Sequence, residues 1–330
     1  MILHPGALAL LVASVATAGL LLHAAGHGLV ILRHWDLSSG SELQLRLERR
    51  TYLVSTLVGW VMAFELVSLF LYVFTADALA PLFRGAMCAA GSLRAAPGGY
   101  QVLVLKLAGA VLAGLWLLLD HADRQGFDYP LLRPKYAALL AVAPLLLAEA
   151  WLQLRFLTAL RPQVITSCCG SLFGRSGAGL AGDLAGLPPR AAAAAFLAAA
   201  GAALLAAVAL RRTGRGALPL ALASALLLPA GLAAAIAWVS PYVYELPTHH
   251  CPFCLLQREY LGIGYPLYAA LLGASVAGMG AGLLAPFRRI PSLAQAVPAL
   301  QRRLAGAAAV LGAALLAIVA WAVLGSNLKG

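Results

Sequence analysis

Charged residues are scarce in this chain of 330 residues. Asp, Glu, Lys and Arg make up 11% of the sequence, and three residues in total are lysine. Soluble globular proteins carry about 25% charged residues, so a folded surface this poor in charge could not be kept in water. The 62% share of apolar residues excludes a disordered chain as well. With five cysteines in this length, the chain is not a disulfide-rich secreted mini-protein.

The motifs of common soluble enzymes are also missing. We find no glycine-rich phosphate loop, no Ser/His/Asp arrangement and no pair of catalytic carboxylates in a polar segment. Glycine repeats such as Gly278-Met-Gly280-Ala-Gly282 lie inside apolar runs, where they favour close helix packing. The net charge of +11 comes from arginine clusters between apolar runs, which is typical of membrane topology and not of nucleic-acid binding.

Long apolar runs are what the sequence has in abundance. A helix that crosses a bilayer needs about 20 predominantly apolar residues. Charges or Pro/Gly/Ser clusters end each of these runs. We therefore predict an all-α, polytopic membrane protein with eight transmembrane helices, at approximately residues 6–32, 52–75, 101–119, 136–160, 191–210, 217–239, 259–286 and 304–324.

The arginines predict the orientation of these helices. Alternate loops, at 33–51, 120–135, 211–216 and 287–303, hold 14 of the 23 basic residues. Short loops rich in Lys and Arg stay on the cytoplasmic side, so both termini are expected outside. All five cysteines then lie in segments on the outer face. In bacteria that face of the inner membrane is oxidising, which favours disulfide chemistry in the periplasm.

The strongest motif is the segment His249-His-Cys-Pro-Phe-Cys-Leu-Leu-Gln-Arg258. A Cys-x-x-Cys pair can close a small-ring disulfide, and we expect Cys251 and Cys254 at or near the start of the seventh helix. Unpaired backbone N–H groups there would favour a thiolate. Arg258 would follow one turn later on the same helical face and stabilise negative charge. A static disulfide or a metal-binding knuckle remains as an alternative.

This motif resembles the Cys-x-x-Cys-x-x-x-Arg signature of the DsbB disulfide-bond oxidases. The resemblance implies a membrane thiol–disulfide oxidoreductase that exchanges electrons between periplasmic thiols and ubiquinone or menaquinone. Cys251 and Cys254 would be the catalytic pair beside the quinone. Arg258 would bind the quinone, and the flanking Gln257 and His250 are expected with it.

The order of helices and cysteines is similar to that of the bacterial vitamin K epoxide reductase family. By that resemblance, Cys168 and Cys169 are catalytic shuttle cysteines that pass electrons from a thioredoxin-like protein, or another thiol protein, to Cys251 and Cys254. The two cysteines are adjacent here, whereas the family's loop cysteines are separated. The resemblance divides the chain into a three-helix membrane region at 1–133 and a five-helix redox region at 134–330.

Two other functions fit the same residues. A soft-metal (Cu, Zn or Hg) binding or transport protein would use sulfur and imidazole ligands, here Cys168, Cys169, His249, His250, Cys251 and Cys254. A non-enzymatic subunit of a membrane electron-transfer complex would use its cysteines to brace outer loops. The odd cysteine, Cys88, either pairs with a loop cysteine or is a half-buried small apolar residue.

A few polar residues lie inside the predicted helices. Charges in the membrane are costly and mark function by default. We expect Lys106 and Arg155 to extend toward the outer interface. Glu65 and Glu149 are expected to pair with these bases or to lie in a polar cavity, and a role in carrying protons for quinone chemistry is a hypothesis. His23, His27 and His121 could bind a haem, although hydrogen bonding between helices is the commoner role of such residues.

Overall fold

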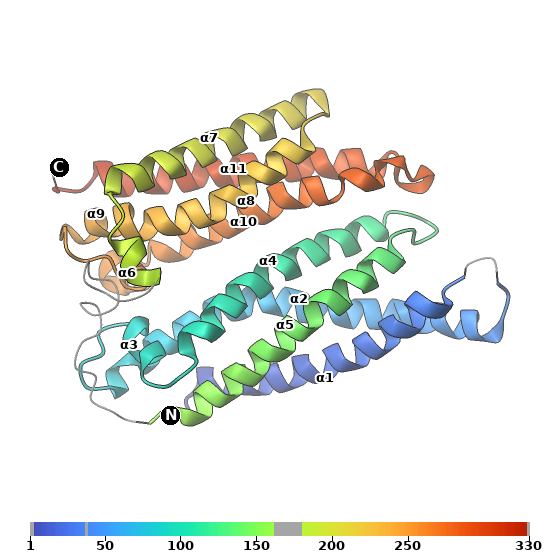
Figure 1. The fold of residues 1–330 in the computed structure, drawn as a ribbon, viewed down its shortest axis with the longest axis horizontal. Helices are drawn as coiled ribbons and strands as arrows, with labels where there is room; N and C mark the ends of the chain where they lie inside the picture. Colours follow the sequence, from blue (N-terminus) through green and yellow to red (C-terminus); the bar gives the residue numbers. More distant parts are fainter. Residues whose placement is uncertain (1–2, 37–38, 162–179, 329–330) are drawn as a thin grey trace. The chain divides into compact units, whose positions relative to one another are not determined.

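The computed structural model describes residues 3–36, 39–161 and 180–328. Most of these residues are helical, they contain no strand, and eight helices are long and apolar enough to cross a membrane. The all-α, multi-pass prediction is therefore confirmed (Figure 1). The eight long helices are α1 (Pro5–His34), α2 (Glu42–Leu79), α4 (Gly99–Asp123), α5 (Leu132–Ala159), α7 (Pro189–Thr213), α8 (Ala217–Ala234), α10 (Gly264–Leu283) and α11 (Ala296–Leu324).

The chain divides into two compact units. Unit 1 comprises residues 1–75, 93–161 and 289–296, and unit 2 comprises residues 76–92, 162–288 and 297–330. This division differs from the boundary expected at residue 133, because α5 packs along α1 and α4 within unit 1. Each unit thus contains four long helices.

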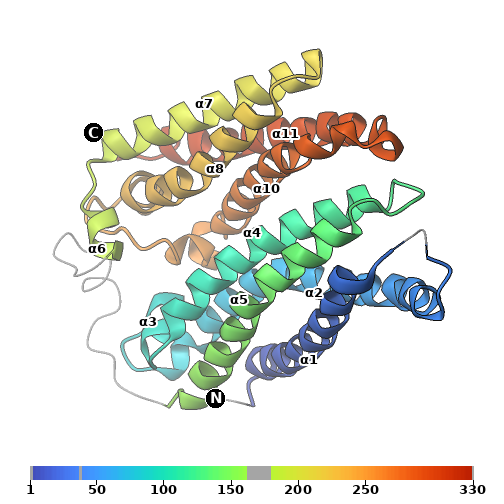
Figure 2. The same cartoon turned by 45° about the vertical axis from the view of Figure 1, so that its right-hand side comes forward.

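Unit 1 is built from α1, α2, α4 and α5, which run side by side in both views (Figures 1 and 2). All four helices contribute to one core, which includes Leu21, Val58, Trp116 and Tyr136. Large apolar side chains also point outward, as Trp60 does with 73% of its surface exposed. An apolar exterior around an apolar core is what a lipid environment favours.

Unit 2 contains a bundle of α7, α8, α10 and α11. Glycines let two of these helices approach closely, because a Cβ atom at Gly278 would lie 1.9 Å from Ser224 Oγ of α8. After α8 the chain forms a π-helical turn, η2 (Ala235–Val239), and then the short α9 (Ser240–Tyr244). Such π-helical turns are frequent at functional sites, and this one leads into the Cys-x-x-Cys segment.

The close contact between α8 and α10 generates a stability prediction. Gly278→Ala should lower the free energy of unfolding by about 1–3 kcal/mol, since the methyl group overlaps Ser224 and forces the helices apart. Gly201→Ala on α7 is the matched control. A Cβ atom at Gly201 would meet nothing within 4 Å, so this change should stabilise the helix by about 0.5–1 kcal/mol. Thermal unfolding in detergent measures both, and equal melting temperatures would refute this packing.

Candidate functional site

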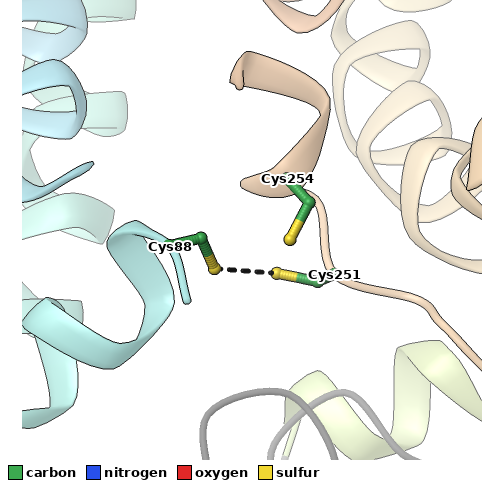
Figure 3. Close-up of side chains that lie close together, drawn as sticks. All are labelled: Cys88, Cys251 and Cys254. Carbon is green, nitrogen blue, oxygen red and sulfur yellow. Dashed lines mark hydrogen bonds between the residues drawn. The ribbon is translucent and has the colours of Figure 1, made fainter. Parts of the chain in front are cut away.

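Three cysteines from distant parts of the sequence meet in unit 2. The Sγ atoms of Cys88, Cys251 and Cys254 all lie within 4.8 Å of one another, and we call this group the cysteine cluster (Figure 3). Cys88 and Cys251 are 163 positions apart in sequence, yet their sulfurs are joined by an S–H···S hydrogen bond of 3.6 Å. The side chains are well shielded, with 0%, 0% and 5% of their surfaces exposed. The cluster is therefore part of the packed interior of unit 2.

Two hydrogen bonds position the Cys88 segment. Asp77, in the last turn of α2, accepts a bond of 3.1 Å from the backbone N–H of Ala89 at the start of α3 (Ala89–Arg94). The Gln257 amide donates to the carbonyl oxygen of Met87 at 2.7 Å. The residues on either side of Cys88 are thus tied, one of them to the loop that carries the other two thiols.

Tyrosines from the neighbouring helices hold the Cys-x-x-Cys loop. The hydroxyl of Tyr244 in α9 donates to the carbonyl oxygen of Cys251. The hydroxyl of Tyr268 in α10 donates to the carbonyl oxygen of Pro252 at 3.0 Å. Because these carbonyls lie outside regular helix, the tyrosines supply partners that the backbone does not.

The expected helix start at the cysteine pair is wrong. Cys254 opens a three-residue 3-10 turn, η3 (Cys254–Leu256), and α10 begins at Gly264. Extended backbone at Gln257 (ψ 154°) and left-handed backbone at Leu261 (φ 58°) interrupt any helix between them. Arg258 therefore starts a separate turn, η4 (Arg258–Tyr260), and does not follow Cys254 on one helical face. The N-terminus of α10 is not what would stabilise a thiolate here.

The three residues expected around a quinone have different surroundings. Arg258 is exposed, and Gln257 is occupied by its bond to the Met87 carbonyl. His250 is buried, and its Nδ1 lies 3.1 Å from the carbonyl oxygen of Ile236 in the π-helical turn η2. A carbonyl accepts, so Nδ1 carries the hydrogen and Nε2 keeps a lone pair. Nε2 is buried, and among the described residues nothing hydrogen bonds to it.

Aromatic rings lie next to the cluster. Tyr244 makes edge contacts, at 4.6 Å between ring centroids, with both His249 and Tyr260. Burial lowers the pKa of the His249 imidazole; negative charge on Cys88 opposes this effect, and His250 adds to it. Burial raises the pKa of the Tyr260 hydroxyl, and charge on Cys254 adds to the rise. Both rings are therefore neutral hydrogen-bonding groups near the sulfurs.

The structure brings together part of the predicted set and adds one residue. Cys251 and Cys254 are in the cluster, whereas Cys168 and Cys169 lie outside the described residues. Sequence reasoning did not place Cys88 with the Cys-x-x-Cys pair, and its description as half-buried is wrong because none of its surface is exposed. The usable signal was its predicted location on the same side of the membrane as the other cysteines.

The polar residues within the helices also differ from expectation. Lys106 does not extend to the interface but is buried, with Nζ 2.6 Å from Glu149 Oε1. The expected pairing of Glu149 with a base is thus confirmed, and Arg155 is exposed. His27 Nε2 lies 3.2 Å from Thr51 Oγ1, so it links α1 and α2 by a hydrogen bond.

The shifted pKa of His249 predicts a pH dependence. The ordinary pKa is 6.5 and the folded value is lower, so the unfolded chain binds a proton first as the pH falls below 6.5. Stability should therefore fall as the pH is lowered from 7 toward 5, and His249→Gln should reduce that fall. His34→Gln, at the exposed end of α1, is the control. Thermal unfolding across this pH range measures the slopes, and equal slopes for the His249 variant and the original protein would contradict the prediction.

Comparison with known proteins identifies no relative of this chain. No family model, no curated protein and no solved structure matches the chain. The chemistry of the cysteine cluster therefore rests on its own residues. These are three buried cysteines whose backbone segments are positioned by hydrogen bonds that Asp77 accepts and that Gln257, Tyr244 and Tyr268 donate.

Proposed function

We propose that this protein is a membrane thiol–disulfide oxidoreductase that transfers two electrons from thiols to a membrane quinone. One observation carries the proposal. Cys251 belongs to a Cys-x-x-Cys pair and also lies 3.6 Å, sulfur to sulfur, from a third thiol, Cys88. A disulfide bond is about 2.05 Å long, so a small approach of the sulfurs would close one. Three thiols in such contact can pass a disulfide from one pair to another.

Exchange within the cluster moves a disulfide from one pair of sulfurs to another. The thiolate of Cys88 attacks Cys251 in a Cys251–Cys254 disulfide. The Cys88–Cys251 bond forms, the Cys251–Cys254 bond breaks, and Cys254 leaves as a thiolate that takes up a proton. No electrons are gained or lost in this step. Net oxidation occurs when two thiols become a disulfide, which releases two electrons and two protons to the quinone as the oxidising substrate.

The residues around the cluster suit a lipid-soluble acceptor. The two loops that supply the thiols expose apolar side chains at Met87, Leu246 and Leu261, with 73%, 52% and 80% of their surfaces accessible. Arg258 adds an exposed positive charge on the loop of Cys254. His250 adds a buried Nε2 atom that makes no hydrogen bond to the described residues. A quinone needs such an apolar surface and a cation that favours its reduced oxyanion.

The cellular setting is part of the proposal. The arginine pattern supports a bacterial inner membrane protein with both termini and all five cysteines on the periplasmic side. Electrons would enter from a thioredoxin-like or other thiol protein through Cys168 and Cys169, and then reach Cys88, Cys251 and Cys254. The likeness to DsbB and vitamin K epoxide reductase proteins supports electron flow from thiols to quinone. The same direction is favoured because quinones are stronger oxidants than protein disulfides.

Soft-metal binding is the second candidate function, and the burial of the cluster favours it. Two sulfurs that bind one zinc ion at about 2.3 Å each lie roughly 4 Å apart. The three Sγ atoms already lie within 4.8 Å of one another. Thiolates are preferred ligands of Cu(I), Zn(II) and Hg(II). Metal analysis of protein purified without chelator decides between the two functions: about one ion per chain, lost in Cys88→Ser, would favour the metal site.

Cys254→Ser tests the redox proposal. The variant should reduce a short-chain quinone at least about 1,000-fold more slowly with a dithiol donor, since its pair can no longer form a disulfide. The assay follows the loss of quinone absorbance with full-length protein in detergent. Ser275→Ala, which changes another small buried side chain of unit 2, is the control and should retain the original rate.

Cys88→Ser separates the third thiol from the pair. Quinone should still oxidise Cys251 and Cys254 once in this variant, but steady turnover with donor thiols should fall, because exchange through Cys88 is lost. Unchanged quinone reduction by Cys254→Ser would remove the proposed mechanism. Equal steady-state rates of quinone reduction for Cys88→Ser and the original protein would show that Cys88 takes no part in the mechanism.

A further inference from the structure

Unit 1 contains a second polar cluster, built from residues other than the cysteines. Glu65 and Ser68 of α2, Lys106 of α4 and Glu149 of α5 lie inside three of the membrane-spanning helices. At most 5% of the surface of each residue is exposed. Ionisable residues inside such helices are rare and costly, so a group of three needs a physical explanation.

Hydrogen bonds join the four side chains. The Lys106 ammonium donates to Glu149 Oε1 at 2.6 Å and to Ser68 Oγ at 3.0 Å. The Ser68 hydroxyl donates toward Glu65, with 3.2 Å to Oε2 and 3.1 Å to the backbone carbonyl. The Tyr72 ring lies 5.8 Å from the Lys106 nitrogen. On α1, the uncharged Ser14 accepts a hydrogen bond from Gln153, which lies one turn beyond Glu149.

The charges of this cluster do not balance if every group is ionised, because two carboxylates would share one ammonium. Another buried cluster of unit 1 provides the contrast. There, Asp120 and Asp123 face Lys135 and Arg124, so two carboxylates meet two cations. An uncompensated charge in a low-dielectric interior costs several kcal/mol. The cluster around Lys106 is therefore expected to hold one positive charge, one negative charge and one neutral acid.

One carboxyl oxygen of this cluster lacks a hydrogen-bond donor, which indicates where the proton of the neutral acid lies. Glu149 Oε2 is buried, and no donor among the described residues reaches it. The carboxyl groups of Glu65 and Glu149 lie within hydrogen-bonding reach of each other. Two ionised carboxylates cannot hydrogen bond to each other, because neither carries a hydrogen. If one of the two carboxyl groups is protonated, its O–H can donate to the other. Gly109 leaves the room for this contact, since a Cβ atom there would lie 3.3 Å from Glu149 Oε2.

We infer that Glu65 and Glu149 share one proton and form a proton-binding site inside the membrane-spanning part of unit 1. The proton joins a carboxylate as an O–H bond and leaves by breaking that bond, with no electron transfer. Lys106 holds the second carboxyl ionised, and Ser68 connects Lys106 to Glu65. The site stands on its own residues and does not depend on the proposed thiol chemistry.

Infrared spectroscopy of the full-length protein in lipid tests this site. At pH 7 the original protein should show the C=O stretching band of a protonated carboxyl, shifted in D₂O. Glu65→Gln and Glu149→Gln should each lose it, because the remaining carboxyl pairs with Lys106 and ionises. Lys106→Met should increase the band, since neither carboxyl then has a cation. Asp123→Asn, in the balanced cluster, should leave the band unchanged.

Three results would overturn the inference. The first is the absence of a protonated carboxyl band at pH 7, and the second is an unchanged band in both glutamine variants. The third is a band that appears only when sodium is replaced by choline, which would show that the site holds a sodium ion. Glutamine keeps the shape of glutamate and can still accept from Lys106. Melting temperatures of these variants near the original value would confirm that any loss of the band is not due to unfolding.

Discussion

A bilayer offers no hydrogen-bond partners, so each polar group of a membrane-spanning chain must find its partner within the protein. Several charged side chains within the described helices follow this constraint. Apolar side chains such as Trp60 face outward, while Lys106, Glu149 and Lys135 are buried and paired. The sulfurs of the cysteine cluster lie in segments beyond the long helices, where backbone carbonyls accept hydrogen bonds from Tyr244 and Tyr268.

The two polar clusters have different chemistry because their surroundings differ. In unit 2, soft thiols of Cys88, Cys251 and Cys254 contact one another with aromatic rings nearby, which suits exchange of electron pairs or binding of a soft ion. In unit 1, hard oxygen and nitrogen groups surround an unbalanced charge, which suits a proton. Among the described residues, each unit therefore encloses a polar cluster built from its own side chains.

Much of the architecture could be predicted from the sequence, since hydropathy and arginine clusters follow directly from the physics of the bilayer. All eight long helices were predicted, and the motif also singled out Cys251 and Cys254, which lie together in the cysteine cluster. Local structure near the pair could not be predicted, because left-handed backbone at Leu261 and extended backbone at Gln257 break a helix that composition favours. The partner of the pair was also missed: the approach of Cys88 to Cys251 depends on tertiary bonds from Asp77 and Gln257, for which the sequence carries no local signal.

The contact between Cys88 and Cys251 is the claim on which the proposed function depends. Mass-spectrometric mapping of disulfides, in protein reduced and then exposed to quinone, tests it most directly. We predict that quinone converts the three thiols into a mixture of two linkages, Cys251–Cys254 and Cys88–Cys251, and that a dithiol reverses both. Recovery of Cys88, Cys251 and Cys254 as thiols after exposure to quinone, or of Cys88 linked only to Cys168 or Cys169, would contradict the account.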